Sequence, residues 1–189
     1  EIKVDYILIT HGHEDHVADV QRIATNNPNA ILISNFEIIS WFGQKGLKGH
    51  PMNHGGKRQF EFGTVKYVNA IHSSVLPDGS YGGNPGGFVL WDENSCFYIA
   101  GDTALTQDMK LIPQLCPTLD FAILPIGDNF TMGYEEAIVA AQFVQCKKVV
   151  ACHFDTFPPI QINHDEVLTA FQSNNIELYL PEIGEKIEF

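Results

Sequence analysis

The stretch of the sequence most able to do chemistry is residues 7–20, ILITHGHEDHVADV. It places five side chains that can bind a metal within six positions: His11, His13, Glu14, Asp15 and His16. Imidazole and carboxylate groups are ligands for divalent zinc, manganese, iron and cobalt. Side chains packed this closely repel one another or compete for water unless a cation organises them. The stretch therefore predicts a metal site.

The spacing within this stretch indicates more than one ligand direction. His11 and His13 are two residues apart, so their side chains converge only if the backbone between them is extended or turned. In a zincin helix, by contrast, the two histidines are four residues apart. Asp15 and His16 follow about one turn later, where a helix is expected to begin. The two pairs can start two metal sites, whereas Glu14 falls between them and is expected to be solvated.

Three further candidate ligands each follow an apolar segment that reads as a strand. His72 comes after VKYVNAI, Asp102 after CFYIAG and His153 after KKVVAC. Ligands at the ends of neighbouring strands meet at one edge of an α/β sheet even when they are distant in sequence. We therefore expect all three to join the histidine cluster.

The full pattern, H-x-H-x-D-H followed by the three single ligands, resembles the metallo-β-lactamase superfamily of binuclear hydrolases. The stretches GGNPGGFVLWD, AGDTALTQDM, LPIGDNFTMGYEEA and ACHFDTFPPIQ resemble its metal-dependent hydrolases near the ascorbate-6-phosphate lactonase branch, over nearly the whole chain. The resemblance implies one metal held by His11, His13 and His72, a second held by Asp15, His16 and His153, and Asp102 as the bridge.

Two divalent cations sharing a water would lower its pKa from about 15.7 toward about 7, which supplies a bridging hydroxide at neutral pH. Asp15 is the candidate catalytic residue, because it could orient this hydroxide or move its proton. Zinc is the favoured cofactor, with manganese, iron and cobalt as alternatives. The expected reaction is hydrolysis of a small ester, lactone or phosphate-containing substrate.

Hydrophobic periodicity predicts an α/β architecture in which strands alternate with helices in the second half. Strands are expected at residues 4–10, 30–34, 64–70, 88–92, 96–102, 120–127, 147–152, 176–180 and 186–189, and helices at 17–24, 34–42, 109–115, 135–146 and from 163. Ser34 with Glu37 resembles a capping box. Residues 43–63 and 72–87 read as irregular loops, the first ending in a short strand.

The resemblance implies an αββα sandwich, and the length predicts a single domain over residues 1–189. Members of the superfamily carry several strands before the H-x-H-x-D-H motif, but only ten residues precede it here. We therefore expect the N-terminal strands of the sandwich to be missing from this chain and one apolar sheet edge to be exposed.

Composition limits the partners. The net charge of −12 repels phosphate backbones, and no cluster of Lys and Arg reverses it, so nucleic acid is not expected. No apolar run reaches the roughly 20 residues of a membrane span. We expect a small-molecule substrate and leave homo-oligomerisation open. The four cysteines show no C-x-x-C spacing, which favours reduced thiols and the cytoplasm.

Two other residues are candidate substrate contacts, His54 in a glycine-rich loop and Asn129 after an apolar strand. Thr131 could contact substrate or cap the following helix through Glu135. Three alternative functions remain open at this stage: a nuclease or phosphodiesterase of the same superfamily, an iron redox protein, and a metal-binding protein without activity. The redox branch replaces the second histidine with Glu, whereas this chain has His13.

Overall fold

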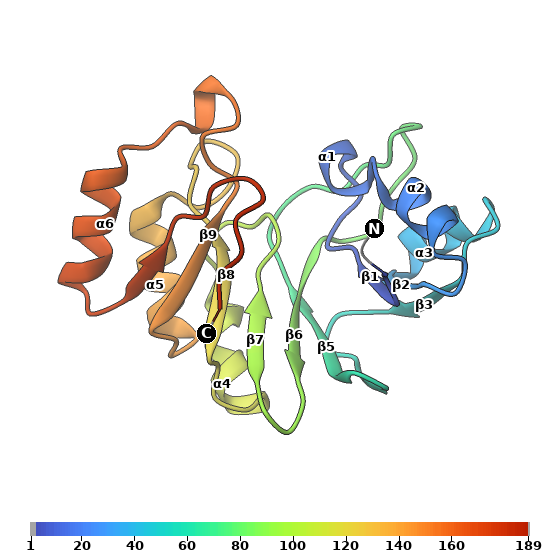
Figure 1. Cartoon of the computed structure of the whole chain (residues 1–189), viewed down its shortest axis with the longest axis horizontal. Helices are drawn as coiled ribbons and strands as arrows, with labels where there is room; N and C mark the ends of the chain where they lie inside the picture. The colour runs from blue at the N-terminus through green and yellow to red at the C-terminus, as the bar shows by residue number, and fades with distance from the viewer. Residues whose placement is uncertain (1–2, 189) are drawn as a thin grey trace.

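The computed structural model describes residues 3–188, which form two β-sheets packed face to face between two layers of helices (Figure 1). The smaller sheet is parallel, with the order β1 (Tyr6–Leu8), β2 (Ile31–Asn35) and β3 (Gly49–Met52). The larger has seven strands in the order β10 (Glu177–Tyr179), β9 (Lys148–Cys152), β8 (Phe121–Pro125), β7 (Cys96–Ile99), β6 (Gly86–Trp91), β5 (Gly63–Asn69) and β4 (Lys57–Phe60).

The helices lie on the outer faces of the two sheets. The smaller sheet is covered by α1 (Glu14–Val17), α2 (Val20–Asn26) and α3 (Phe36–Gly43). The larger sheet is covered by η1 (Gln107–Leu111), α4 (Ile112–Leu115), α5 (Tyr134–Phe143) and α6 (His164–Ser173), with η2 (Pro158–Ile160) in the loop before α6. The predicted αββα sandwich is confirmed. None of the helices within residues 3–188 is long and apolar enough to cross a bilayer.

The side chains of each strand alternate between its two faces and so contribute to two layers of the core. In β2, Leu32 packs with the helices on one face, and Ile33 packs between the sheets on the other. Val65 and Tyr67 of β5 meet Ile33 from the opposite sheet, and all three are fully buried. Successive side chains of a strand point to opposite faces, so a run of apolar residues fills both layers.

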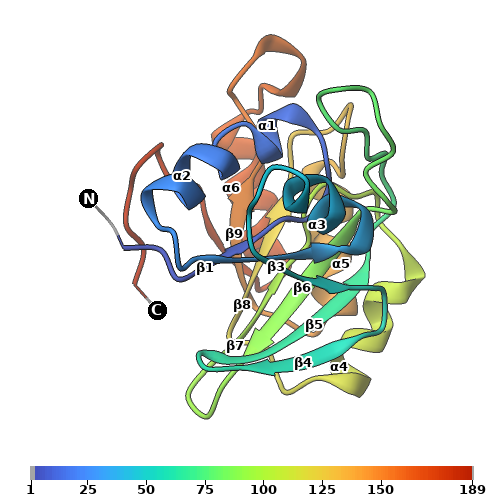
Figure 2. The ribbon, with the colours of Figure 1, turned by 90° about the vertical axis from the view of Figure 1, so that its right-hand side faces the viewer.

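The strand directions bring the predicted ligand segments to one end of the molecule. β5 and β7 both pair antiparallel with β6, and β7, β8 and β9 are mutually parallel neighbours. The loops that follow β5, β7, β8 and β9 therefore leave the larger sheet at the same end. Figure 2 shows this end at the top, where α1, the green loop after β5 and the orange loop after β9 gather.

Several predicted elements were wrong in detail. The helix expected at 17–24 is two short helices, α1 and α2. The first half of the loop predicted at 43–63 contains β3, which pairs with β2. Residues 186–188 form no strand, and Phe189, the last residue of that prediction, lies outside the described residues.

The predicted cap at Ser34 was wrong, and of the two roles left open for Thr131 the structure does not show the cap. Asn35, not Ser34, caps α3, because its side chain accepts a hydrogen bond from the Ile38 N–H. The Ser34 hydroxyl instead donates to the Ile9 carbonyl and joins β2 to the segment after β1. Helix α5 begins after Gly133 with no side-chain cap, and the Thr131 hydroxyl donates to the Met132 carbonyl.

Candidate metal centre

One carboxylate oxygen lies at the centre of the predicted cluster. Oδ2 of Asp102 is 3.3 Å from Nε2 of both His16 and His153, and 3.8 Å from Nε2 of both His11 and His72. These five residues come from four separate segments of the chain. The arrangement surrounds one oxygen of Asp102 with four imidazoles.

Three groups of ligand atoms in the described residues lie within 4.8 Å of one another, which is close enough to hold a metal ion. They are His11, His13 and His72; Asp15, Asp102 and His153; and His11, His16 and Asp102. Together the groups contain all seven residues that the sequence singled out as ligands. The neighbouring Glu14 is exposed and belongs to none of these groups.

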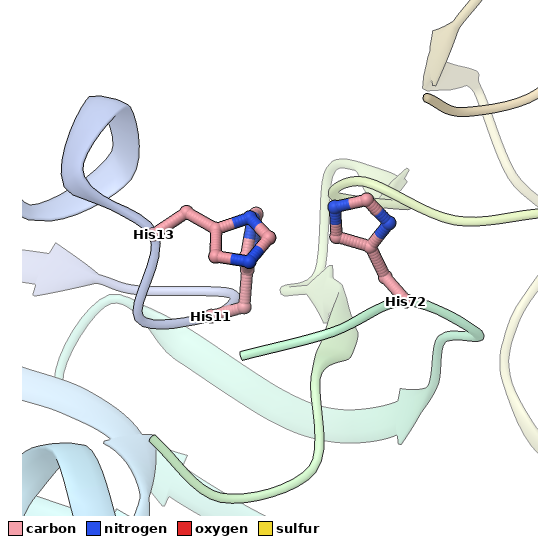
Figure 3. Close-up of side chains that lie close together, drawn as sticks. All are labelled: His11, His13 and His72. Carbon is pink, nitrogen blue, oxygen red and sulfur yellow. The ribbon is translucent and has the colours of Figure 1, made fainter. Parts of the chain in front are cut away.

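The rings of the first group point toward one another, two from the segment after β1 and one from the segment after β5 (Figure 3). His11 Nε2 and His13 Nδ1 are 3.0 Å apart. The other nitrogen of each ring is already occupied: Thr10 Oγ1 lies 3.0 Å from His11 Nδ1, and Ser73 Oγ lies 3.0 Å from His13 Nε2. Such outer partners fix the orientation of metal-binding imidazoles. The two nitrogens left facing each other are therefore the candidate ligand atoms.

Burial and hydrogen bonds shift the pKa values of two residues of the site. Burial and the neighbouring His16 lower the pKa of His11 to about 3, so its ring is neutral and able to bind a cation. Burial would raise the pKa of Asp102, but hydrogen bonds from His153 and His16 hold it below the usual range of a carboxyl. Five imidazoles and two carboxylates without a thiolate form a donor set that fits divalent zinc, manganese, iron or cobalt.

Two glycines let the strand ends approach one another. Gly101 has φ +65°, and a Cβ there would lie 2.8 Å from Cβ of Thr10. A Cβ at Gly127 would lie 2.1 Å from the carbonyl oxygen of His153. Gly101 therefore permits close approach to the Thr10 side chain, and Gly127 to the His153 carbonyl, and these approaches bring Asp102 and His153 beside His11.

The two predicted substrate contacts lie outside this cluster. Among the described residues, His54 belongs to no group of ligand atoms; its Nε2 is 2.9 Å from the Pro85 carbonyl and its ring packs against Tyr67. Its contact with substrate stays a prediction. Asn129 is exposed, with φ 54°, in the loop after β8. That loop is hydrogen-bonded to the segment of Asp102 through Met132, so the prediction for Asn129 also stands.

The sequence did not identify Thr10 and Ser73 as outer partners of the histidines. Each directly adjoins a predicted ligand, His11 in one case and His72 in the other, and this adjacency was the only signal available. A hydroxyl next to a ligand is too common to be predictive without the geometry of the rings.

Replacing Ser73 with Ala is expected to weaken metal binding about tenfold without removing a ligand, because the His13 ring loses the partner of its Nε2 atom. Metal titration by calorimetry would measure this. The matched control is Ser95→Ala, which removes a hydroxyl from the β6–β7 turn and should leave the affinity unchanged. Equal affinities in all three proteins would show that Ser73 does not orient His13.

The αββα sandwich with this His and Asp cluster at its strand ends defines the metallo-β-lactamase class of proteins. The family described as "Beta-lactamase superfamily domain" matches residues 2–154, and the chain belongs to this superfamily. The narrower likeness to the ascorbate-6-phosphate lactonase branch stays a prediction.

Its relatives include proteins named UPF0173 metal-dependent hydrolase. One from Christiangramia forsetii is 56% identical over 100% of this chain and 82% of its own length, and one from Flavobacterium johnsoniae is 59% identical over 99% and 82%. A solved structure, Igni18, a novel metallo hydrolase from Ignicoccus hospitalis, is 32% identical, with a TM-score of 0.87 over 99% of this chain and 81% of that one. The chain is thus a member of a family of metal-dependent hydrolases.

Proposed function

We propose that this chain hydrolyses a small ester, lactone or phosphate-containing molecule with a pair of divalent cations, zinc being favoured. The observation that carries the proposal is the position of Asp102 Oδ2 among four imidazole Nε2 atoms at 3.3–3.8 Å. A single carboxylate oxygen shared by two sets of ligands is the feature expected of two neighbouring metal sites rather than one.

In this proposal the residues divide into two sets. His11, His13 and His72, which form one group of ligand atoms, would hold one cation. Asp15, His16 and His153 would hold the other, and Asp102, which lies in a group with each of these three, would be shared. When bound, the pair of cations lowers the pKa of a shared water and polarises the carbonyl or phosphoryl oxygen of the substrate. The neutral ring of His11 and the ionised Asp102 are two ligands that can bind a cation without first losing a proton.

Asp15 is the proposed catalytic residue of the chain. Its side chain is 67% exposed, and its Oδ2 lies 3.5 Å from His16 Nε2, so one carboxylate can face both the ligands and solvent. A group in this position can orient the attacking water and carry its proton toward the leaving group. The hydrolysis then needs no serine or cysteine nucleophile.

Metal analysis tests the proposal directly. We expect about two equivalents of metal per chain in protein purified without chelator, and loss of hydrolysis when chelation removes them. Activity should return on adding zinc, manganese, iron or cobalt, with the order of rates identifying the preferred ion. Less than about one equivalent at neutral pH, or hydrolysis that survives complete removal of metal, would contradict it.

For partners, the proposal is a small-molecule substrate, neither nucleic acid nor membrane. The net charge of −12 supports this, because a polyanion approaching the surface would be repelled. The four cysteines are free thiols in the structure, which supports the cytoplasm as the proposed compartment.

A further inference from the structure

Three large apolar side chains are exposed on the loops after β5, β8 and β9, at the end of the larger sheet where the candidate ligands lie. Ile71, directly before His72, is 51% exposed; Phe130, in the loop after β8, is 51% exposed; and Phe157, four residues after His153, is 41% exposed. We call these three residues the apolar rim. Exposed apolar side chains near a candidate site often mark a surface that binds an apolar part of a ligand.

Contacts between the loops hold the apolar rim beside the ligands. Thr103, the buried residue after Asp102, accepts a hydrogen bond from Ile71 N–H on its hydroxyl and one from Met132 N–H on its carbonyl. This joins the loops of Ile71 and Phe130 to the segment of Asp102. The rings of Phe130 and Phe157 lie 6.0 Å apart, which joins the third loop.

The same loops, together with residues 9–19, carry no Lys or Arg. Residues 9–19, 70–85, 100–106, 126–133 and 153–163 contain no Lys or Arg, although the chain has 11 of them. Their acidic residues are Glu14, Asp15, Asp19, Asp78, Asp102, Asp128 and Asp155.

The basic residues nearest in sequence to these ranges contact other groups. Arg22, three residues after the first range, pairs with Asp19 at 2.9 Å. The ammonium group of Lys110 lies 4.1 Å from the ring centre of Phe143, and that of Lys66 donates to the Gly55 carbonyl. Phosphate and carboxylate groups outside the reacting bond are usually held by Arg or Lys, and the loops around this site offer neither.

From these observations we infer that the substrate is an uncharged carboxylic ester or lactone whose apolar acyl part packs on Ile71, Phe130 and Phe157, and that phosphate esters are excluded. The inference rests on the proposed function and narrows it. In the reaction, the oxygen of water bonds to the acyl carbon, the bond from that carbon to the alcohol oxygen breaks, and a proton of the water passes to the alcohol. The cations would act on the ester group that is cleaved, whereas the apolar rim would bind the apolar acyl chain of the substrate.

The test uses the metal-loaded protein and p-nitrophenyl esters of acetate, butyrate and hexanoate. We expect kcat/KM to rise about threefold for each added methylene, as apolar burial predicts. The mono-p-nitrophenyl ester of adipate has the hexanoyl chain with a terminal carboxylate, and it should be cleaved at least about tenfold more slowly than the hexanoate. p-Nitrophenyl phosphate should be the poorest of the substrates.

Variants locate the effect. Phe130→Ala and Phe157→Ala should each lower kcat/KM for the hexanoate about tenfold and flatten the dependence on chain length. The matched control is Phe62→Ala, an exposed phenylalanine just before β5, at the opposite end of that strand from His72. This control should keep the wild-type dependence.

A second readout does not depend on turnover. Calorimetry should show hexanohydroxamate binding the zinc-loaded protein at least about tenfold more tightly than acetohydroxamate, with the difference lost in Phe130→Ala.

The outcomes separate the inference from the proposed function. Metal-dependent hydrolysis with no preference for long acyl chains, or with phosphate preferred, would overturn the inference and leave the proposed function intact. Absence of hydrolysis with every substrate would contradict the proposed function; equal affinity for the two hydroxamates would then overturn the apolar rim as well.

Discussion

Asp102→Ala is expected to lower turnover by at least about a thousandfold and to release at least one metal ion per chain. Its Oδ2 is the oxygen shared by four imidazoles, so both proposed sites lose a ligand together. A thousandfold loss corresponds to about 4 kcal/mol of transition-state stabilisation, within what a polarising metal supplies. Metal content and kcat/KM of the purified variant measure the two effects.

The fold should survive this substitution, because the core clusters on both sides of the sheets do not include Asp102. Circular dichroism and urea denaturation of the metal-free proteins would check this. Asp102→Asn keeps the shape of the side chain but removes its charge, and should lose metal as well. Glu14→Ala removes an exposed carboxylate from the same motif and should keep activity within about twofold. Full activity in Asp102→Ala would refute the proposal that Asp102 is a ligand shared by the two metal sites.

The convergence of the candidate ligands could be predicted from sequence because these residues follow strong local signals. His72, Asp102 and His153 each end or follow a buried apolar strand, and parallel neighbours place such residues at one edge. The grouping of His11, His13, Asp15 and His16 could be predicted from their spacing in the sequence alone. These features depend on strand direction and order, which hydrophobic patterns and chain connectivity largely determine.

Features that depend on tertiary contacts could not be predicted. Strand β3, GHPM, contains a glycine and a proline and has no alternating pattern, so only its pairing with β2 identifies it. Ser34 and Asn35 are both residue types that often cap helices. The Ser34 hydroxyl is engaged by the Ile9 carbonyl, 25 positions away in sequence, and Asn35 caps the helix instead. The same holds for Thr10 and Ser73, whose roles depend on the orientation of two rings.

Gly101→Ala is expected to damage the site without changing any ligand. An alanine at φ +65° costs about 1 kcal/mol of backbone strain, and its Cβ would lie 2.8 Å and 2.9 Å from Cβ and Cγ2 of Thr10. Either Thr10 moves, taking the partner of His11 with it, or Asp102 moves away from the histidines. We expect the free energy of unfolding to fall by about 3 kcal/mol and metal affinity to fall at least about tenfold. Urea denaturation of the metal-free protein and metal titration measure these.

The control for strain alone is Gly46→Ala, because Gly46 also has positive φ, +82°, but an added Cβ there meets nothing within 4 Å. It should cost about 1 kcal/mol and leave metal affinity unchanged. Thr10→Ser removes Cγ2 but keeps the hydroxyl beside His11, so in the Gly101→Ala background it should restore about 1 kcal/mol and part of the affinity. If Gly101→Ala and Gly46→Ala cost the same and both bind metal normally, the close approach of Gly101 to Thr10 does not position Asp102. A recovery specific to the double variant would show that this one contact, between the Gly101 backbone and the Thr10 side chain, couples the end of β7 to the segment after β1.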